Sequence, residues 1–170
     1  MTSSLARAIV IVGLCLVANG CLAAELAGRV VGVLDGDTID LLTPEKRQVR
    51  VRLAGIDAPE KNQAFGTVSK QALSDLIFAR EVTVDWRKKD RYGRVVGKVL
   101  LNGVDTDLKM VELGLAWHYK QHAREQSVID RKLYAEAEDS ARARRAGLWR
   151  DAESVPPSSF RHANPKHAND

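Results

Sequence analysis

The spacing of apolar residues predicts a domain that begins with β-strands. Over 48–53, Val49, Val51 and Leu53 alternate with polar side chains, the two-residue period of a half-buried strand. Val-rich or alternating runs predict four further strands, over 26–34, 37–42, 81–86 and 93–101. The three strands before residue 54 follow one another closely, so we expect an antiparallel meander.

Three later segments have the period of an amphipathic helix. They span 67–80, 107–115 and 127–145. The first has its expected apolar face at Val68, Ala72, Leu73 and Leu76. The last has its expected apolar stripe at Leu133, Ala137 and Ala141. Ser127 and Asp130 resemble a capping box, Gly147 can end that helix, and Leu148 and Trp149 are expected to dock back on the body.

Five strands, a helix between the third and fourth, and helices after the fifth predict an α+β domain. This order would suit a small closed barrel such as the OB-fold, which commonly binds nucleic acid, although the pattern alone does not single that barrel out. The domain is expected over 25–150. Residues 151–170 are rich in Pro, Ser, Asn, His and Ala, which predicts a disordered C-terminal tail.

Residues 1–24 have the layout of a secretory signal peptide. Arg7 is the only charge before Glu25, and a short apolar run is followed by small residues. We therefore expect an exported protein, periplasmic or extracellular. Lipidation at Cys21 and an uncleaved N-terminal anchor are the alternatives. Cys15 and Cys21 are the only cysteines, so cleavage after Cys21 would leave a domain without disulfides or cysteine zinc ligands.

The charge balance favours a polyanionic partner without proving one. Lys and Arg number 26 against 22 acidic residues, a formal net charge of +4.

The candidate chemistry lies where predicted strands end. Asp35-Gly36-Asp37-Thr38 is expected to form a tight turn in which Gly36 permits a positive φ, although such a turn is ordinary by itself. Asp57 follows a strand at a loop. Because hard cations prefer carboxylate and carbonyl oxygens, Asp37, Asp57 and the Ala58 carbonyl could share one cation.

A carboxylate, a cation and two arginines together supply what phosphodiester hydrolysis needs. Water must be activated, the phosphoryl oxygens neutralised and the leaving oxygen stabilised. Glu60 offers a carboxylate beside Asp57, and Arg52 lies on the polar face of the preceding strand. Arg94 follows the turn Asp90-Arg91-Tyr92-Gly93 at a strand start, where its forked donors suit phosphate.

Several motifs in register make the chain resemble the staphylococcal (micrococcal) nuclease, or thermonuclease-like, family over roughly 26–150. The matching segments are Asp35–Thr38, Arg52-Leu53, Ile56–Glu60, Asp90–Arg94, Gly114–Ala116 and Gly147–Trp149. The resemblance implies a five-stranded OB-fold barrel with about three α-helices and one calcium ion. Its ligands would be Asp37, Asp57 and the Ala58 carbonyl, supported by Asp35. Oxygen ligands do not exclude Mg²⁺ or Mn²⁺.

The resemblance also implies the reaction. Glu60 would be the general base, and Arg52 and Arg94 would bind the phosphate. Family members cut the 5′ P–O bond of DNA or RNA and leave 3′-phosphate ends. Arg91 and Tyr92 would contact the substrate.

The aromatic segment 117–119 leaves two alternatives open. Tyr119 or Trp117 could stack on a base, or both could pack at the barrel rim. His118 and His122 are expected to be structural or solvent-facing, because the site is complete without them.

The competing functions are a non-catalytic binding module on the same fold and a periplasmic or envelope-associated binding protein. A module of that kind would lack the metal and phosphate residues, all of which are present here. The expected protein is therefore a secreted, calcium-dependent nuclease for DNA and RNA, monomeric and without an obligate protein partner.

Overall fold

The computed structural model describes residues 24–164. The predicted signal peptide, apart from Ala24, lies outside the described residues, as do both cysteines and residues 165–170. No helix within 24–164 has the length and apolar character that crossing a membrane requires.

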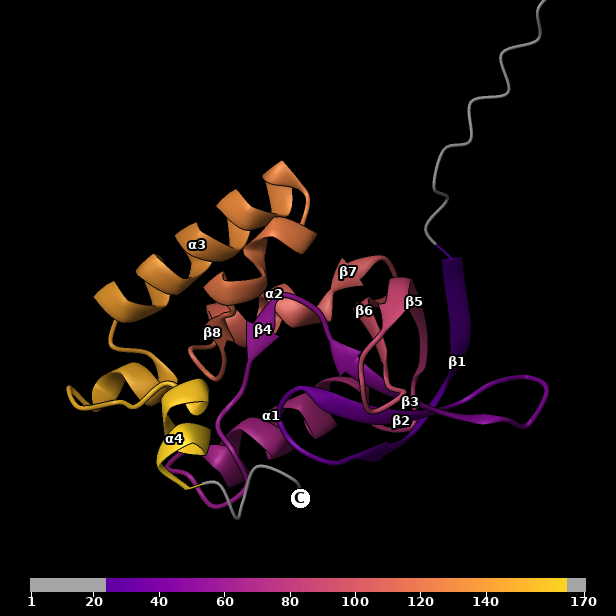
Figure 1. The fold of residues 1–170 in the computed structure, drawn as a ribbon, viewed down its shortest axis with the longest axis horizontal. Coiled ribbons are helices and arrows are strands. Elements are labelled where there is room, and N and C mark those ends of the chain that lie inside the picture. Colours follow the sequence, from indigo (N-terminus) through magenta and orange to yellow (C-terminus); the bar gives the residue numbers. More distant parts are fainter. Residues whose placement is uncertain (1–23, 165–170) are drawn as a thin grey trace, which may run out of the picture.

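A closed barrel forms one half of the molecule (Figure 1). Its strands are β1 (Ala24–Val33), β2 (Thr38–Leu42), β3 (Gln48–Leu53), β5 (Glu81–Lys89) and β6 (Val95–Leu101). They hydrogen-bond in the order β3-β2-β1-β5-β6, and parallel pairing of β3 with β6 closes the sheet. The predicted five-stranded barrel and α+β class are confirmed.

Strand β1 can take part in both walls of the barrel because it is long and bent. It pairs with β2 on one side and β5 on the other, and its register with β2 shifts between Val30 and Gly32. Such a bulge bends a strand and increases its twist. Alternation then buries one face, as in β3, where Val51 and Leu53 lie in the core.

Three two-residue strands extend this framework. They are β4 (Ile56–Asp57), β7 (Val104–Asp105) and β8 (Trp117–His118). Strand β7 continues the sheet beyond β6, across a turn in which Asn102 and Gly103 both have positive φ. Strand β4 pairs with β8 outside the barrel, which places the loop after β4 against the helical half.

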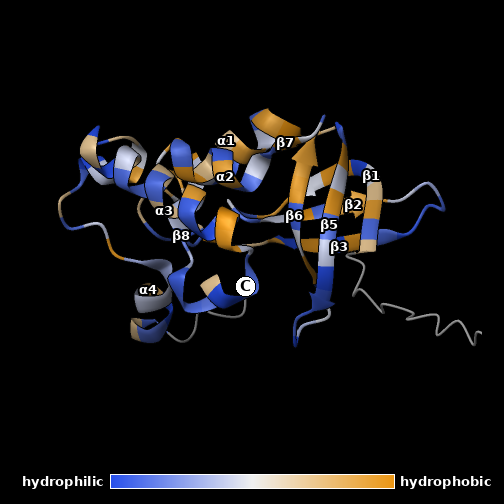
Figure 2. Ribbon diagram, turned by 90° about the horizontal axis from the view of Figure 1, so that it is seen from above, coloured by the Kyte–Doolittle hydropathy of each residue, from blue (hydrophilic) through white to orange (hydrophobic). Residues whose placement is uncertain are grey.

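Most of the helices lie on the side of the molecule away from β1, whereas the first of them also contacts β1 (Figures 1 and 2). They are α1 (Gly66–Ile77), α2 (Thr106–Glu112), α3 (Val128–Ala143) and α4 (Pro157–Ala163), with 3₁₀ helices η1 (Lys120–Glu125) and η2 (Gly147–Arg150). The predicted cap of α3 is confirmed, since the Ser127 hydroxyl accepts the Asp130 N–H at 3.0 Å. The expected docking of η2 is confirmed too, since Leu148 and Trp149 are buried beside Trp117.

Two helical faces differ from the predicted stripes. In α1 Val68 is 52% exposed, whereas Ser69 is buried because its hydroxyl donates to a backbone carbonyl. In α3 Leu133 is 44% exposed, while Tyr134 and Glu138 are buried. Hydrogen-bond partners on neighbouring segments let these polar side chains face inward, and a purely apolar pattern does not detect them.

The expected disordered tail differs from the structure over 151–164. Helix α4 starts with Pro157 in its first turn, where a proline N–H is not needed, and Pro157 is buried. Figure 2 colours much of this segment as hydrophilic, so apolar burial alone does not explain its position. Its attachment also includes ion pairs from Arg161, which belong to the candidate site.

Candidate functional site

The turn between β1 and β2 brings Asp37 to the edge of the barrel. The Asp35 carboxylate accepts the Asp37 N–H at 3.0 Å, and the Asp37 carbonyl accepts the N–H of Leu53 on β3. Gly36 does not have the expected positive φ. It is required for close approach instead, because a Cβ there would collide with the Ser69 hydroxyl on α1.

Asp37 is 6% exposed, and its carboxylate is held from three sides. One oxygen, Oδ2, accepts the Ala58 N–H at 2.7 Å and pairs with Arg52 at 3.0 Å. The other oxygen accepts the Thr38 hydroxyl at 3.1 Å. These contacts join the β1–β2 turn to the loop after β4, two segments separated by about twenty residues of chain.

Arg52 connects the two aspartates. Its Nη2 lies 3.0 Å from Asp37 Oδ2 and 3.1 Å from Asp57 Oδ1, while Nη1 donates to the Leu53 and Ile56 carbonyls, each at 2.9 Å. Burial lowers the pKa of Arg52, but the two carboxylates outweigh it and the net shift is upward. The guanidinium is therefore fixed in orientation and permanently charged.

Strand β4 and the loop that follows it carry Asp57 and Glu60 into the same cluster. Asp57 is 2% exposed, and the Glu60 side chain is 25% exposed. The Glu60 N–H donates to the Gln63 side chain, which shapes the short loop before α1. A fixed, buried carboxylate thus lies beside a more accessible one, which is the arrangement that a general base near a cation would need.

Several acidic residues lie close together in this cluster, and the pKa values of two of them are raised. Burial, aided by the negative charge of Asp37, raises the pKa of Asp35 to about 7. The same two causes raise the pKa of Asp57, against the opposing effect of Arg52. A site of this kind favours any positive charge that can approach its oxygens.

Sequence reasoning missed Arg161. From α4, its Nη1 donates to Asp57 Oδ1 at 3.1 Å and to Glu60 Oε1 at 2.6 Å, and its Nη2 donates to Asp57 Oδ2 at 3.1 Å. The Pro156-Pro157 pair before a polar segment was a signal for a helix start. Nothing in the sequence indicated which acids Arg161 would meet, more than a hundred positions earlier in the chain.

Arg94 immediately precedes β6, the strand beside Arg52, but lies in a separate environment. Strands β3 and β6 run in parallel with Arg52 opposite Val96. The Asp90 carboxylate accepts the Arg94 side-chain Nε at 2.6 Å, and this pairing lowers the pKa of Asp90 despite partial burial. Among residues 24–164, no hydrogen bond or ion pair joins Arg94 to Asp57 or Glu60.

An open groove of about 310 Å³ adjoins Arg94. Its lining residues are Asp40, Gln48, Arg50, Tyr92, Gly93 and Arg94. Tyr92 is 58% exposed, with the Arg91 guanidinium 4.8 Å and the Arg94 guanidinium 5.5 Å from its ring centre. An exposed aromatic ring flanked by two arginines can stack on a base beside a phosphate.

The structure distinguishes between base stacking and internal packing for the aromatic residues of segment 117–119. Trp117 packs edge-on against Trp149 at 5.2 Å in a buried cluster, so it is a core residue. Tyr119 is half-buried with its ring 4.8 Å from that of His122, and it can still meet a ligand. His118 is buried against Gln126, the structural place expected for it.

The proposed ligands are oxygen atoms of the type that a hard cation prefers. Asp37 and Asp57 approach within about 3 Å of the same Arg52 nitrogen, and the Ala58 carbonyl belongs to the same loop. All are oxygen donors, which calcium and magnesium prefer. The described residues contain no group of three or more His, Cys, Asp or Glu arranged to hold a metal, so any such ion would rely on two carboxylates, backbone and water.

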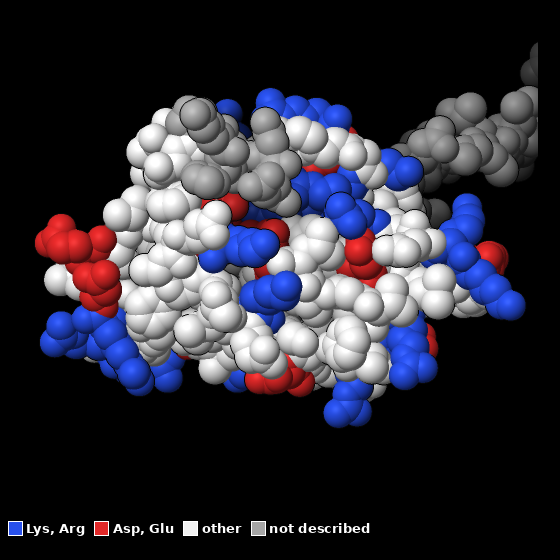
Figure 3. Space-filling view, turned by 90° about the horizontal axis from the view of Figure 1, so that it is seen from below, with Lys and Arg blue, Asp and Glu red and all other residues white. Residues whose placement is uncertain are grey.

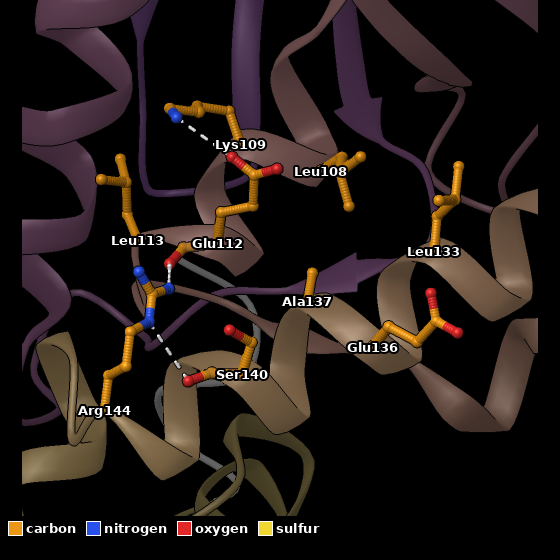
Figure 4. Close-up of a pocket in the computed structure, with 9 residues that line it drawn as sticks. All are labelled: Leu108, Lys109, Glu112, Leu113, Leu133, Glu136, Ala137, Ser140 and Arg144. Atoms are coloured by element: carbon orange, nitrogen blue, oxygen red, sulfur yellow. Dashed lines mark hydrogen bonds and ion pairs between the residues drawn. The ribbon is translucent and has the colours of Figure 1, made fainter.

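Other surface features lie apart from this cluster. A groove of about 480 Å³ runs between α2 and α3, lined partly by Leu113 and Leu133 (Figure 4). Figure 3 shows several separate groups of Lys and Arg on one face, with small acidic areas between them. On this face the basic residues therefore do not form one continuous patch, and the Arg52–Asp57 cluster remains the candidate site.

Comparison with known proteins connects this geometry to a family. The family described as "Staphylococcal nuclease homologue" matches residues 50–151, which include Arg52, Asp57, Glu60 and Arg94. An "Uncharacterized endonuclease" of Haemophilus influenzae is 40% identical over 145 residues, covering 85% of this chain and 78% of that protein. A "Micrococcal nuclease" of Shigella flexneri is 42% identical over 155 residues, covering 86% of both chains.

A third relative, "Protein ParB" of Escherichia coli, is 44% identical over 147 residues, covering 81% of this chain and 80% of that protein. The family match runs from the end of β3 through β5, β6 and the helices up to η2. The chain belongs to the staphylococcal nuclease family, and it is a nuclease.

Proposed function

We propose that this nuclease uses calcium to hydrolyse phosphodiester bonds in DNA and RNA and leaves 3′-phosphate ends. The observation that carries the proposal is the cluster in which Arg52 joins Asp37 to Asp57, with Glu60 on the same loop. A fixed positive group, two buried carboxylates and an accessible carboxylate are the parts that this reaction requires.

In this proposal Asp37, Asp57 and the Ala58 carbonyl hold the cation, and Asp35 supports Asp37 through its backbone N–H. The cation, when bound, neutralises charge on the phosphate and lowers the pKa of nearby water. Magnesium or manganese is compatible with the same oxygen donors.

The protein's own side chains perform the remaining steps. Glu60 accepts a proton from a water molecule whose oxygen attacks phosphorus, and the bond from phosphorus to the 5′ oxygen breaks. Arg52 stays oriented by two carbonyls through Nη1 and exchanges the carboxylates on Nη2 for the phosphoryl oxygens as charge grows on them. The 5′ oxygen takes up a proton from solvent water and Glu60 returns its proton to solvent, so the products are a 3′-phosphate and a 5′-hydroxyl.

Arg94 and Tyr92 would bind the substrate chain at the edge of the site. For Arg94 to reach phosphate, its guanidinium has to exchange the Asp90 carboxylate for the phosphate oxygens, a replacement of one anion by another. Arg91 and Tyr119 are the further candidate contacts, since their positions leave them partly open to a ligand.

We propose that the protein acts as a monomer after export, in the periplasm or outside the cell, with a lipid anchor at Cys21 as the alternative. The signal-like composition of residues 1–24 supports export. N-terminal sequencing of the protein from its native host decides between a free exported protein and one that begins at a lipid-modified Cys21. An intact N-terminus on cytosolic protein would contradict export.

The decisive test is cleavage of plasmid DNA and of RNA with calcium, followed by chelation and analysis of the product ends. We expect cleavage to stop on chelation and the ends to carry 3′-phosphate. Glu60→Gln should lower kcat roughly 100-fold or more, because general base catalysis contributes about that much. Glu45→Gln, in the exposed β2–β3 turn, is the matched control. Cleavage by Glu60→Gln at the wild-type rate would contradict the role of Glu60.

A further inference from the structure

Helix α4 is held against the site by contacts on both sides of its first turn. The Gln63 side chain, in the loop before α1, donates to the Val155 carbonyl. Pro157, in the first turn, is buried against the body, while the bonds from the Phe160 and Asn164 N–H groups to the Pro156 and Phe160 carbonyls, at 3.0 Å each, are internal to the helix. Figure 1 shows α4 beside the start of α1. The segment therefore has a defined position next to the Asp57–Glu60 loop.

Arg161 extends from α4 into the candidate site. Both Asp57 carboxylate oxygens accept hydrogen bonds from it at 3.1 Å, and Glu60 accepts a third at 2.6 Å. Its side chain is 28% exposed, so these are partly desolvated, charge-assisted bonds, stronger than ordinary surface ion pairs. The pKa of Arg161 is raised because the attraction of these acids outweighs burial, so it stays charged.

These contacts are incompatible with the working site as proposed. A cation bound by Asp57 needs a carboxylate oxygen that Arg161 now covers, and it would bring a second positive charge beside the guanidinium. Glu60 cannot accept a proton from water through the oxygen that binds Arg161. Arg161 therefore has the right charge and position to take the place of the cation and to hold the base.

We propose that α4 is an autoinhibitory cap, in which Arg161 occupies Asp57 and Glu60 and is displaced when the cation binds. The inference rests on the proposed function of this site. Because the two cannot share the same oxygens, the coupling is reciprocal. Removing Arg161 tightens cation binding, and adding the cation releases α4.

The first measurement is calcium affinity by isothermal titration calorimetry on the full chain. Arg161→Ala should bind calcium about three- to tenfold more tightly than wild type, the range expected for losing partly exposed charge-assisted bonds. Arg161→Lys keeps the charge but not the fork, so its affinity should fall between the two. His162→Ala, an exposed position on the same helix, should match wild type.

The second measurement is hydrogen exchange in wild type with and without calcium chloride. The Phe160 and Asn164 amides should exchange faster with calcium, while barrel amides should not change. Nuclease rates at limiting calcium should rise in Arg161→Ala, and the rates should converge at saturating calcium. Thermal unfolding of each variant shows whether it is folded.

Three outcomes would overturn the proposal that α4 is an autoinhibitory cap. Equal calcium affinity in wild type and folded Arg161→Ala would refute the competition while leaving the nuclease proposal intact. Loss of activity in Arg161→Ala at saturating calcium would make Arg161 a contributor to catalysis. No calcium binding by either protein would refute the cap together with the calcium dependence of the proposed function.

Discussion

Arg52 is the residue on which most of the candidate site depends. Its two terminal nitrogens contact two backbone carbonyls and two carboxylates, all within 2.9–3.1 Å. Only a planar fork can satisfy these partners together and still direct charge to a phosphate. Its position on β3 was predictable from the alternation of that strand, whereas its carbonyl partners depend on how the chain turns after Leu53.

Arg52→Lys should lower kcat/KM roughly 100-fold or more, because a single ammonium cannot replace the oriented donors. Steady-state cleavage of a short labelled oligonucleotide measures the loss. Arg47→Lys, in the exposed β2–β3 turn, is the control and should cleave at the wild-type rate. Near-normal turnover in Arg52→Lys would remove Arg52 from the proposed mechanism.

Helix α2 is attached to the barrel by its core residues Met110 and Val111 and by Asp107 in its buried first turn. Asp107 is fully buried, and its two oxygens accept the Ala54 N–H at 2.9 Å and the Val99 N–H at 3.1 Å. Burial raises the pKa of Asp107 well above its usual range. The side chain thus accepts one backbone N–H from β6 and shares another, from the β3–β4 turn, with the Gly97 carbonyl.

Asp107→Ala should lower the free energy of unfolding by roughly 1–3 kcal/mol, since it removes the acceptor of the buried Val99 N–H and one of the two acceptors of the Ala54 N–H. Urea unfolding followed by tryptophan fluorescence gives the value. Lys109→Ala, two residues along the same helix, removes only an exposed pair with Glu112 and should cost less than about 1 kcal/mol. Similar losses in both variants would show that the buried hydrogen bonds are not important for stability.

The elements themselves were largely predictable because their periods are local. Helices α1, α2 and α3 begin within one residue of the predicted starts, and β3 spans the predicted 48–53. The inward face of α3 was not predictable in the same way. Tyr134 replaces Leu133 there because its hydroxyl donates to Asp105 at 3.1 and 3.0 Å, a partner supplied by another part of the chain.

The segment after α2 and the segment after α3 meet at Gly114 and Gly147. Gly114 has a φ of 67°, and its carbonyl accepts the Leu148 N–H at 2.9 Å. A Cβ on Gly114 would collide with the Ala146 carbonyl. The chain after α2 therefore packs directly against the chain after α3, and this contact positions Trp149 and the segment that leads to α4.

Gly114→Ala should cost roughly 2–4 kcal/mol, through backbone strain and the loss of this close approach. Gly103→Ala is the matched control, with a φ of 79° and nothing within 4 Å of the added Cβ. It should show the conformational cost alone, about 1–2 kcal/mol. Thermal or urea unfolding measures both, and equal costs would mean that the contact between the two segments adds nothing.

Local pattern in the sequence was enough for the class of fold, the strands and helices, and the acidic and basic motifs that resemble the nuclease family. These features depend on neighbours within a few residues, where period and turn chemistry act directly. The close approach at Gly36, the link from Arg52 to two aspartates and the contact of Arg161 with Asp57 and Glu60 depend on distant segments. Only the closed barrel and the packed helices bring those charges together, because each lies on a different element.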